Sequence, residues 1–156
     1  IWVLGDDDLP KINSLEIIKN HINKYPSCKL FNYFSPHKFH CKRENDEKLY
    51  GANSYLSRSR FLGDYMFISN LIFSKKFILP ALTDAINWQS SYLSQLIISI
   101  NILGSKSLSI FSAKTIIETR ATKNKTAPKE ASHTLIERVQ AYSTLLVIRL
   151  LNVLSR

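Results

Sequence analysis

Three consecutive aspartates, Asp6, Asp7 and Asp8, are the best indication of function in this sequence. They directly follow an apolar run over residues 1–4 and Gly5. A short apolar run bounded by turn residues is typical of a buried strand. Like charges this close together repel one another unless a cation is shared between them. The sequence therefore predicts a buried strand that ends in a turn holding a divalent cation.

The residues after the aspartates predict a helix and a second strand. Leu15, Ile18 and Ile22 recur at helical spacing, Tyr25-Pro26 ends the helix, and residues 28–34 read as a strand. A strand, helix, strand unit is typical of a right-handed parallel crossover, so we expect an α/β fold. Ligands bind at the carboxyl ends of the strands in open parallel sheets, and the aspartates fall at such an end.

Further along, loops alternate with short helices and strands. The polar stretch over residues 35–50 predicts a surface loop. The other expected elements are helices over 53–62, 75–79 (stopping at Pro80) and 88–103 (ending at Gly104), and strands over 66–73, 108–111 and 114–118. We divide the chain into an α/β part, residues 1–118, and residues 119–156, a basic linker followed by a long C-terminal helix.

The net charge of +9 suits anionic ligands such as phosphates, nucleotides or acidic lipid surfaces, although a solvated basic surface has the same composition. The spacing of Cys28 and Cys41 fits neither a zinc site nor a disulfide scaffold, which favours a reducing cytosol. His37 and His40 lie near Cys41, but no second ligand pair follows, so we interpret them as solvated loop residues.

Residues 1–10, Ile-Trp-Val-Leu-Gly-Asp-Asp-Asp-Leu-Pro, resemble the central strand and Asp-x-Asp motif of family 2 glycosyltransferases with the A-type fold. The resemblance is greatest to bacterial enzymes similar to abequosyltransferase, which build surface polysaccharides such as O-antigen. Residues 67–76 resemble the acceptor-side strand and basic turn of that family, and residues 119–124 weakly resemble a late loop. The resemblance covers most of residues 1–125, and only its opening motif is specific.

The resemblance implies a partial A-type fold with a Rossmann-like mixed sheet, of which residues 1–118 are the acceptor-side part. In this family the nucleotide-binding half precedes the aspartate motif. We therefore expect the chain to be the C-terminal part of a longer protein, and activity of this part alone is an open question.

Carried over position by position, the resemblance implies that Asp6 and Asp8 hold Mn²⁺ or Mg²⁺, with Asp8 as the main ligand. It also implies that Asp6 or Asp7 lies near the donor ribose. In the alternative register, Gly5 and Asp7 occupy the two motif positions. A solvated turn that favours the start of the next helix is the alternative without a ligand.

Inverting members of the family use a carboxylate as general base, usually in a Glu-Asp pair at the start of a helix. The matching residues 87–92 contain no acid, which puts catalytic competence in question. Asp84 is the nearest carboxylate, and Asp64 is a second candidate for the base. Trp88 is a candidate for stacking on the acceptor sugar or for the core.

The function we expect is metal-dependent transfer of a sugar from a nucleotide-diphosphate donor to a bacterial glycan or lipid-linked acceptor. The expected location is the cytoplasm or the inner face of the cell membrane, with peripheral membrane contact. The alternative is a non-catalytic membrane-surface or partner-binding module built on the basic stretch 106–129 and the C-terminal helix. Nucleic-acid binding has only the net charge in its favour and no recognition motif, so we expect no nucleic-acid partner.

Overall fold

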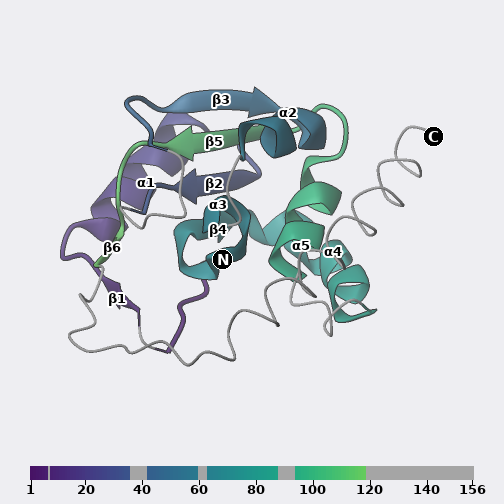
Figure 1. Cartoon of the computed structure of the whole chain (residues 1–156), viewed down its shortest axis with the longest axis horizontal. Helices are drawn as coiled ribbons and strands as arrows, with labels where there is room; N and C mark the ends of the chain where they lie inside the picture. The colour runs from purple at the N-terminus through teal and green to yellow at the C-terminus, as the bar shows by residue number, and fades with distance from the viewer. Residues whose placement is uncertain (7, 36–41, 60–62, 88–93, 119–156) are drawn as a thin grey trace, which may run out of the picture.

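The computed structural model describes residues 1–6, 8–35, 42–59, 63–87 and 94–118. Its centre is a four-stranded mixed sheet in the order β3 (Glu47–Tyr50), β5 (Leu108–Ser112), β2 (Leu30–Tyr33) and β4 (Leu71–Phe73) (Figure 1). β2 and β5 are parallel, whereas β3 and β4 each run antiparallel to their neighbour. The α/β class expected from the sequence is confirmed.

The start of the chain extends this sheet beyond β4. Trp2 forms an antiparallel bridge to Ile72, and the backbone groups of Ile1 and Phe73 bond each other in both directions, at 2.6 and 2.9 Å. The segment therefore runs parallel to β2, with β4 between them. The sequence predicted that this segment is a buried strand, and the prediction was wrong about the burial of its side chains. In the described structure the segment lies at the edge of the sheet, where β4 is the strand that pairs with it. Ile1, Val3 and Leu4 are consequently 41–44% exposed.

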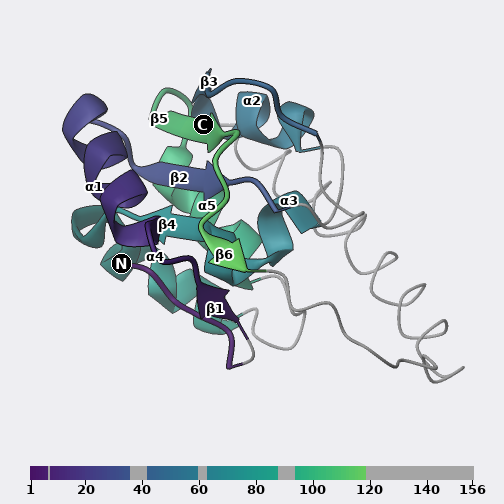
Figure 2. The same ribbon diagram turned by 90° about the vertical axis from the view of Figure 1, so that its left-hand side faces the viewer.

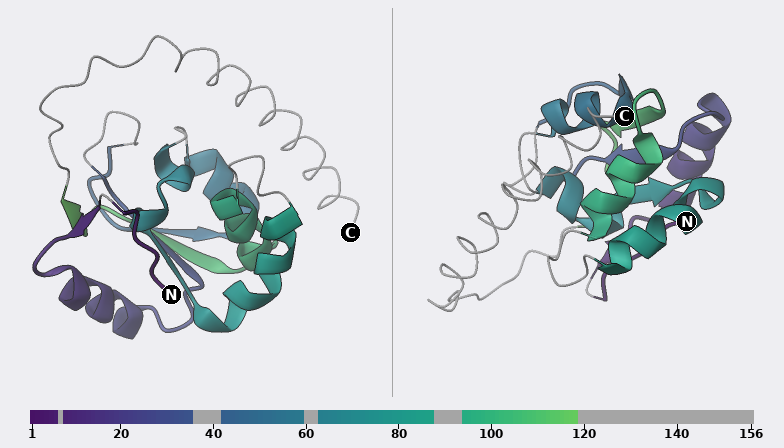
Figure 3. Two further views of the ribbon diagram at one scale, coloured as in Figure 1. Left: turned by 90° about the horizontal axis from the view of Figure 1, so that it is seen from below. Right: turned by 90° about the vertical axis from the view of Figure 1, so that its right-hand side faces the viewer.

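Helices cover both faces of the sheet (Figure 3, left). α1 (Ser14–Lys24) packs on one face, and α2 (Gly51–Arg58), α4 (Lys75–Asn87) and α5 (Ser94–Leu103) pack on the other. Successive side chains of β2 point to opposite faces of the sheet, so the strand contributes to both cores. Leu30 belongs to the cluster under α2, α4 and α5, and Phe31 belongs to the cluster under α1.

Away from the main sheet, β1 (Leu9–Pro10) and β6 (Ile117–Glu118) form a separate two-stranded antiparallel pair (Figure 2). This pair ties the residues that follow the aspartates to the residues that follow β5. Lys11 strengthens the connection, because its backbone N–H donates to the carbonyl oxygen of Ile116 at 2.9 Å.

The predicted helix after the aspartates is present, but its buried face differs from the expectation. Ser14, Ile18 and His21 are buried, whereas Leu15 and Ile22 are 71% and 47% exposed. The buried set has i, i+4, i+7 spacing, and a buried histidine in it has polar partners, as described below. Hydrophobicity alone therefore identified Ile18 correctly but placed Leu15 and Ile22 on the buried face in error.

The expected surface loop over residues 35–50 was wrong in two places. Residues 47–50 form β3, and the Arg43 side chain is buried. β3 is a short, charged edge strand that pairs with β5, and its charged residues hid the strand pattern.

Further boundaries differ from the prediction: the helix expected over 53–62 is α2, residues 51–58, and the strand expected over 114–118 is β6, residues 117–118. α4 continues through Pro80 to Asn87 instead of stopping, with the proline exposed. The predicted strand over 66–73 is shorter: its first residues belong to α3 (Gly63–Met66) and a 3₁₀ helix, η1 (Ile68–Asn70). By contrast, the predicted strand over 108–111 and the helix end at Gly104, which has φ +50°, are confirmed.

The predicted linker and C-terminal helix over residues 119–156 lie outside the described residues. Among the helices that the structure does describe, none is long and apolar enough to cross a lipid bilayer.

Candidate functional site: the aspartate turn

The aspartates follow residues 1–4, the segment that pairs with β4. Because this segment runs parallel to β2, the aspartates lie at the end of the sheet where β2 and β5 also finish. We call this the aspartate end of the sheet. Asp6 is exposed, Asp8 is half-buried, and Asp7 lies outside the described residues. The position of the turn is the one at which open α/β sheets bind ligands.

Ser69, on η1, fixes the shape of this turn. Its hydroxyl donates to Oδ2 of Asp8 and accepts the backbone N–H of Gly5 at 2.8 Å. Its carbonyl oxygen accepts the indole N–H of Trp2 at 2.8 Å. Ser69 is fully buried, and the N–H of Asp8 closes the turn onto the Gly5 carbonyl at 3.2 Å. One buried serine therefore holds both ends of the turn and orients the Asp8 carboxylate.

The carboxylates that the structure describes in the turn are those of Asp6 and Asp8. No group of three His, Cys, Asp or Glu side chains able to hold a metal occurs within the described part of the chain. Mg²⁺ in phosphate-handling sites is commonly held by one or two carboxylates together with waters and substrate phosphate oxygens. Asp8, held by Ser69, and the exposed Asp6 supply that smaller donor set.

Asp64 lies at the same end of the sheet in a buried ion pair with Arg43. Nη2 of Arg43 is 2.8 Å from Oδ1 of Asp64, and both side chains are 0% exposed. The same guanidinium donates to the Asn32 carbonyl at 2.6 Å and to the Ser112 carbonyl at 3.3 Å, at the ends of β2 and β5. We interpret Asp64 as the counter-ion of Arg43, because a carboxylate enclosed in this way has no exposed surface for a substrate.

The pair belongs to a larger buried network. Asn32 donates to the Tyr55 hydroxyl at 3.0 Å and to the Asp64 carbonyl, and it accepts from Arg43 at 2.9 Å. The guanidinium also lies over the Phe111 ring, 4.2 Å from its centroid. Burial lowers the pKa of Arg43, and the Asp64 charge opposes that shift. The network joins β2, α2, α3 and β5 beneath the aspartate end.

Asp84 lies elsewhere. It is half-buried on α4, and its Oδ2 accepts from Nδ2 of Asn101 at 2.8 Å. Asn101 is in the last turn of α5, which ends where β5 begins, at the opposite end of the sheet from the aspartate turn. The structure therefore does not bring the two sequence candidates for the base together. Trp88, the candidate acceptor contact, lies outside the described residues.

A second polar cluster connects His21 of α1 to Tyr33 of β2 and to Asp46, which precedes β3. His21 lies with Nε2 3.2 Å from Oδ2 of Asp46 and Nδ1 3.1 Å from the Tyr33 hydroxyl. Oδ1 of Asp46 accepts from the Ser112 hydroxyl at 2.7 Å and from the Ala113 N–H at 3.0 Å. Burial lowers the pKa of His21, with Asp46 acting in the opposite direction. A neutral His21 that donates from Nε2 and accepts at Nδ1 satisfies both partners.

Sequence reasoning missed Ser69 and Arg43. Ser69 lies inside the stretch 67–76 that carries part of the family resemblance, so a search for hydroxyl partners of the aspartates in that stretch could have found it. Arg43 offered no such signal, because it sits among charged residues in a polar segment.

Comparison of the chain with protein-family models, with curated proteins and with solved structures finds no match.

Proposed function

We propose that this chain is part of a metal-dependent glycosyltransferase that uses a nucleotide-diphosphate sugar as donor. The acceptor is a bacterial glycan or a lipid-linked sugar, and the fold is the acceptor-side part of an A-type domain. We assign the reaction to the cytoplasmic side of the cell membrane. The observation that carries the proposal is the aspartate turn, in which a buried serine holds a carboxylate at the end of the mixed sheet where its parallel strands finish.

Three further points support this assignment. The residues of the turn are those that resemble the Asp-x-Asp motif. The described sheet is mixed, as the A-type fold requires. Ser69 connects the two stretches that carry the resemblance, residues 1–10 and 67–76, by direct hydrogen bonds.

In this proposal Asp8 and Asp6 hold Mn²⁺ or Mg²⁺ against the donor diphosphate. The cation supplies Lewis-acid stabilisation of the leaving nucleotide. Ser69 presents the Asp8 carboxylate in one orientation, which lowers the entropy lost when the ligand binds. Neither Asp64 nor Asp84 is given the role of base, since the first is enclosed in an ion pair and the second lies at the other end of the sheet.

Thermal unfolding with a panel of nucleoside diphosphates tests the assignment. We expect Mn²⁺ together with one of UDP, GDP, CDP or TDP to raise Tm by about 5 °C or more at a saturating ligand concentration. Neither Mn²⁺ nor the nucleotide alone should reproduce the increase. A Tm that is unchanged with every pair, for a chain shown by circular dichroism to be folded, would contradict the proposal.

A variant pair locates the effect. Asp8→Asn removes a proposed ligand, whereas Glu16→Gln removes the same charge from an exposed position in the first turn of α1. We expect Asp8→Asn to abolish the increase in Tm and Glu16→Gln to retain it. Equal behaviour of the two variants would show that the nucleotide binds elsewhere.

A further inference from the structure

The end of the sheet opposite the aspartates carries lysines in the segments that form it, and the acid placed near it, Asp84, is half-buried and bonded to Asn101. These segments are residues 22–29, 50–54, 74–79 and 102–108, which lie where β2 and β5 begin and where β3 and β4 finish. Five lysines belong to them, and Lys48 reaches the same region from β3. We call this set the lysine end: Lys24, Lys29, Lys48, Lys75, Lys76 and Lys106.

The ammonium groups gather around two aromatic rings. Nζ of Lys24 and Nζ of Lys48 lie 5.1 and 5.5 Å from the centroid of Tyr25. Nζ of Lys29 and Nζ of Lys76 lie 4.0 and 5.7 Å from the centroid of Phe77. Two like-charged groups around each ring repel one another, and a nearby anionic surface relieves that repulsion.

The placement of Lys75 and Lys76 does not serve the stability of their helix. They occupy the first turn of α4, a helix of 13 residues, where the macrodipole disfavours positive charge. Both side chains are exposed, and no acidic residue occurs in that first turn. Charges that cost stability at an exposed position are better explained by a ligand outside the molecule.

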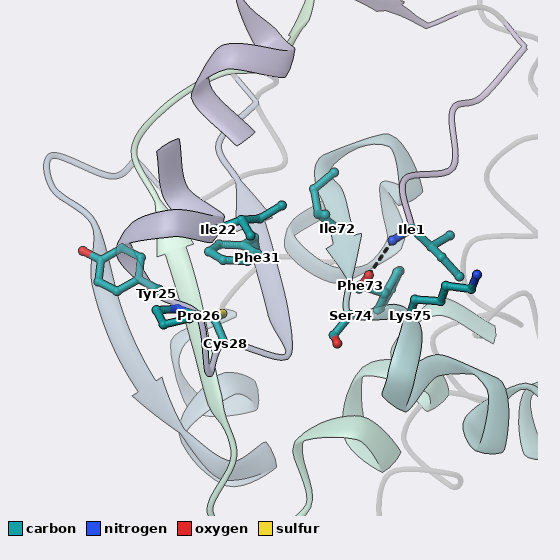
Figure 4. A pocket seen from close by; sticks show the side chains of 10 residues that line it. All are labelled: Ile1, Ile22, Tyr25, Pro26, Cys28, Phe31, Ile72, Phe73, Ser74 and Lys75. Atoms are coloured by element: carbon teal, nitrogen blue, oxygen red, sulfur yellow. Dashed lines mark hydrogen bonds between the residues drawn. The ribbon is translucent and has the colours of Figure 1, made fainter. Parts of the chain in front are cut away.

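An apolar pocket of about 210 Å³ opens beside these lysines (Figure 4). The end of α1 and the start of β2 line one side of it with Ile22, Tyr25, Pro26 and Phe31, and Ile1, β4 and Lys75 line the other. Ile22 is 47% exposed at its rim. The pocket therefore places apolar walls next to the exposed ammonium group of Lys75.

We propose that the lysine end is a docking surface for an anionic lipid bilayer, with headgroup phosphates on the lysines and part of an acyl chain in the pocket. The combination of charge and exposed apolar side chains, including Ile22, Tyr50 and Leu79, favours a bilayer over a water-soluble polyanion. All six basic residues of the set are lysines, which suit diffuse attraction to headgroups, whereas arginine dominates planar phosphate recognition. The inference stands apart from the sugar-transfer proposal, because the two surfaces lie at opposite ends of the sheet.

Vesicle sedimentation of the full chain tests the docking surface. Wild type should bind phosphatidylcholine vesicles that contain phosphatidylglycerol, bind pure phosphatidylcholine vesicles weakly, and lose affinity as salt is added. The double variant Lys75→Glu/Lys76→Glu should weaken binding to the anionic vesicles by at least about tenfold.

The matched control is Lys19→Glu/Lys42→Glu, which changes the net charge equally at exposed positions outside the lysine end. It should weaken binding by no more than about threefold, through the net charge alone. A third variant, Ile22→Ser, tests the pocket and should weaken binding severalfold without changing the dependence on salt. Melting curves establish that each variant is folded.

Three results would overturn the inference. The first is an equal loss in the two double variants, which would assign binding to net charge or to another part of the chain. The second is the absence of binding to anionic vesicles. The third is a pair of observations: binding to a single-stranded RNA homopolymer depends on Lys75 and Lys76, and binding to vesicles does not. That result would identify a nucleic-acid surface.

Discussion

At the scale of single residues, Ser69 is the side chain on which the aspartate turn depends. It contacts both Gly5 and Asp8 and is fully buried, so no water can replace it without a rearrangement. The carboxylate therefore keeps one orientation, as expected for a ligand of a cation shared with a phosphate.

Replacing Ser69 with alanine should separate this role from simple stability. We expect Ser69→Ala to lower the free energy of unfolding by about 1–2 kcal/mol and to weaken Mn²⁺-nucleotide binding about tenfold. The control is Ser99→Ala, which removes another buried serine hydroxyl, one bonded to the Gln95 carbonyl at 2.7 Å. If both variants weaken the nucleotide equally, Ser69 acts only through general stability.

The Arg43–Asp64 pair should be one of the most sensitive points of the fold. Asp64→Asn leaves a buried guanidinium without its counter-ion, and we expect a loss of about 3–5 kcal/mol in chemical denaturation. The half-buried pair of Arg58 and Glu47, with N–O distances of 2.6 Å, is the comparison, since Glu47→Gln leaves a guanidinium that water still reaches and should cost about 1 kcal/mol. Similar costs for the two substitutions would show that the Arg43 pair is not sealed from water.

His21 should make stability depend on pH. Burial lowers the pKa of His21 below the value of 6.5 that it has in the unfolded chain, so below neutrality the unfolded state binds more protons than the folded state. Stability should therefore fall as the pH drops through 6.5 towards the folded-state pKa.

Denaturation curves of wild type and His21→Gln over this pH range measure the contribution. We expect the loss of stability on acidification to be smaller in the variant, because glutamine does not titrate. A loss of the same size in both proteins would assign the pH dependence to other groups.

At the scale of elements, the turn between β3 and α2 depends on close backbone approach. Gly51 has φ +76°, and a Cβ added there would clash with the Ser105 carbonyl oxygen. Gly104 also has a positive φ, +50°, but an added Cβ would meet nothing within 4 Å.

The two glycines therefore form a matched pair. Gly104→Ala should cost about 1–2 kcal/mol, the penalty for a left-handed alanine. Gly51→Ala should cost clearly more, because the backbone at Ser105, between α5 and β5, has to move as well. The comparison is made by urea denaturation, and equal costs would contradict the tight packing of this turn.

The elements also show what a sequence pattern can and cannot predict. β5 and the end of α5 at Gly104 were predictable, since an apolar run and a glycine after a helix depend on local chemistry. β3 was not, because its charged residues become a strand only by pairing with β5, about 60 residues further along the chain. The buried face of α1 was missed for a similar reason: His21 is buried because Asp46 and Tyr33 reach it from the strands.

The candidate site shows the same division. The position of the aspartates after a strand could be predicted from the order of residues. The Ser69 contact could not, because it joins residues 61 positions apart. Asp84 was the first candidate for the base in the sequence and Asp64 the second, and only the topology puts Asp64 in an ion pair and Asp84 at the far end of the sheet.

At the scale of the whole molecule, the described structure is polarised along its strands. The aspartate turn lies at one end of the sheet and the lysine end at the other. A surface bound to a bilayer by its lysines would hold the aspartates away from the headgroups and open to a nucleotide in solution. This arrangement makes the bilayer proposal compatible with binding of the donor nucleotide from solution, and each proposal is tested separately.

The central claim is that the aspartate turn holds a divalent cation together with a diphosphate. The most direct test is a Mn²⁺ titration of the full chain, followed by the electron paramagnetic resonance signal of the free ion, with and without the nucleoside diphosphate that stabilises it best. We predict that wild type and Glu16→Gln remove Mn²⁺ from solution beyond what the nucleotide removes, and that Asp8→Asn does not. Equal Mn²⁺ uptake by wild type and Asp8→Asn would contradict the claim.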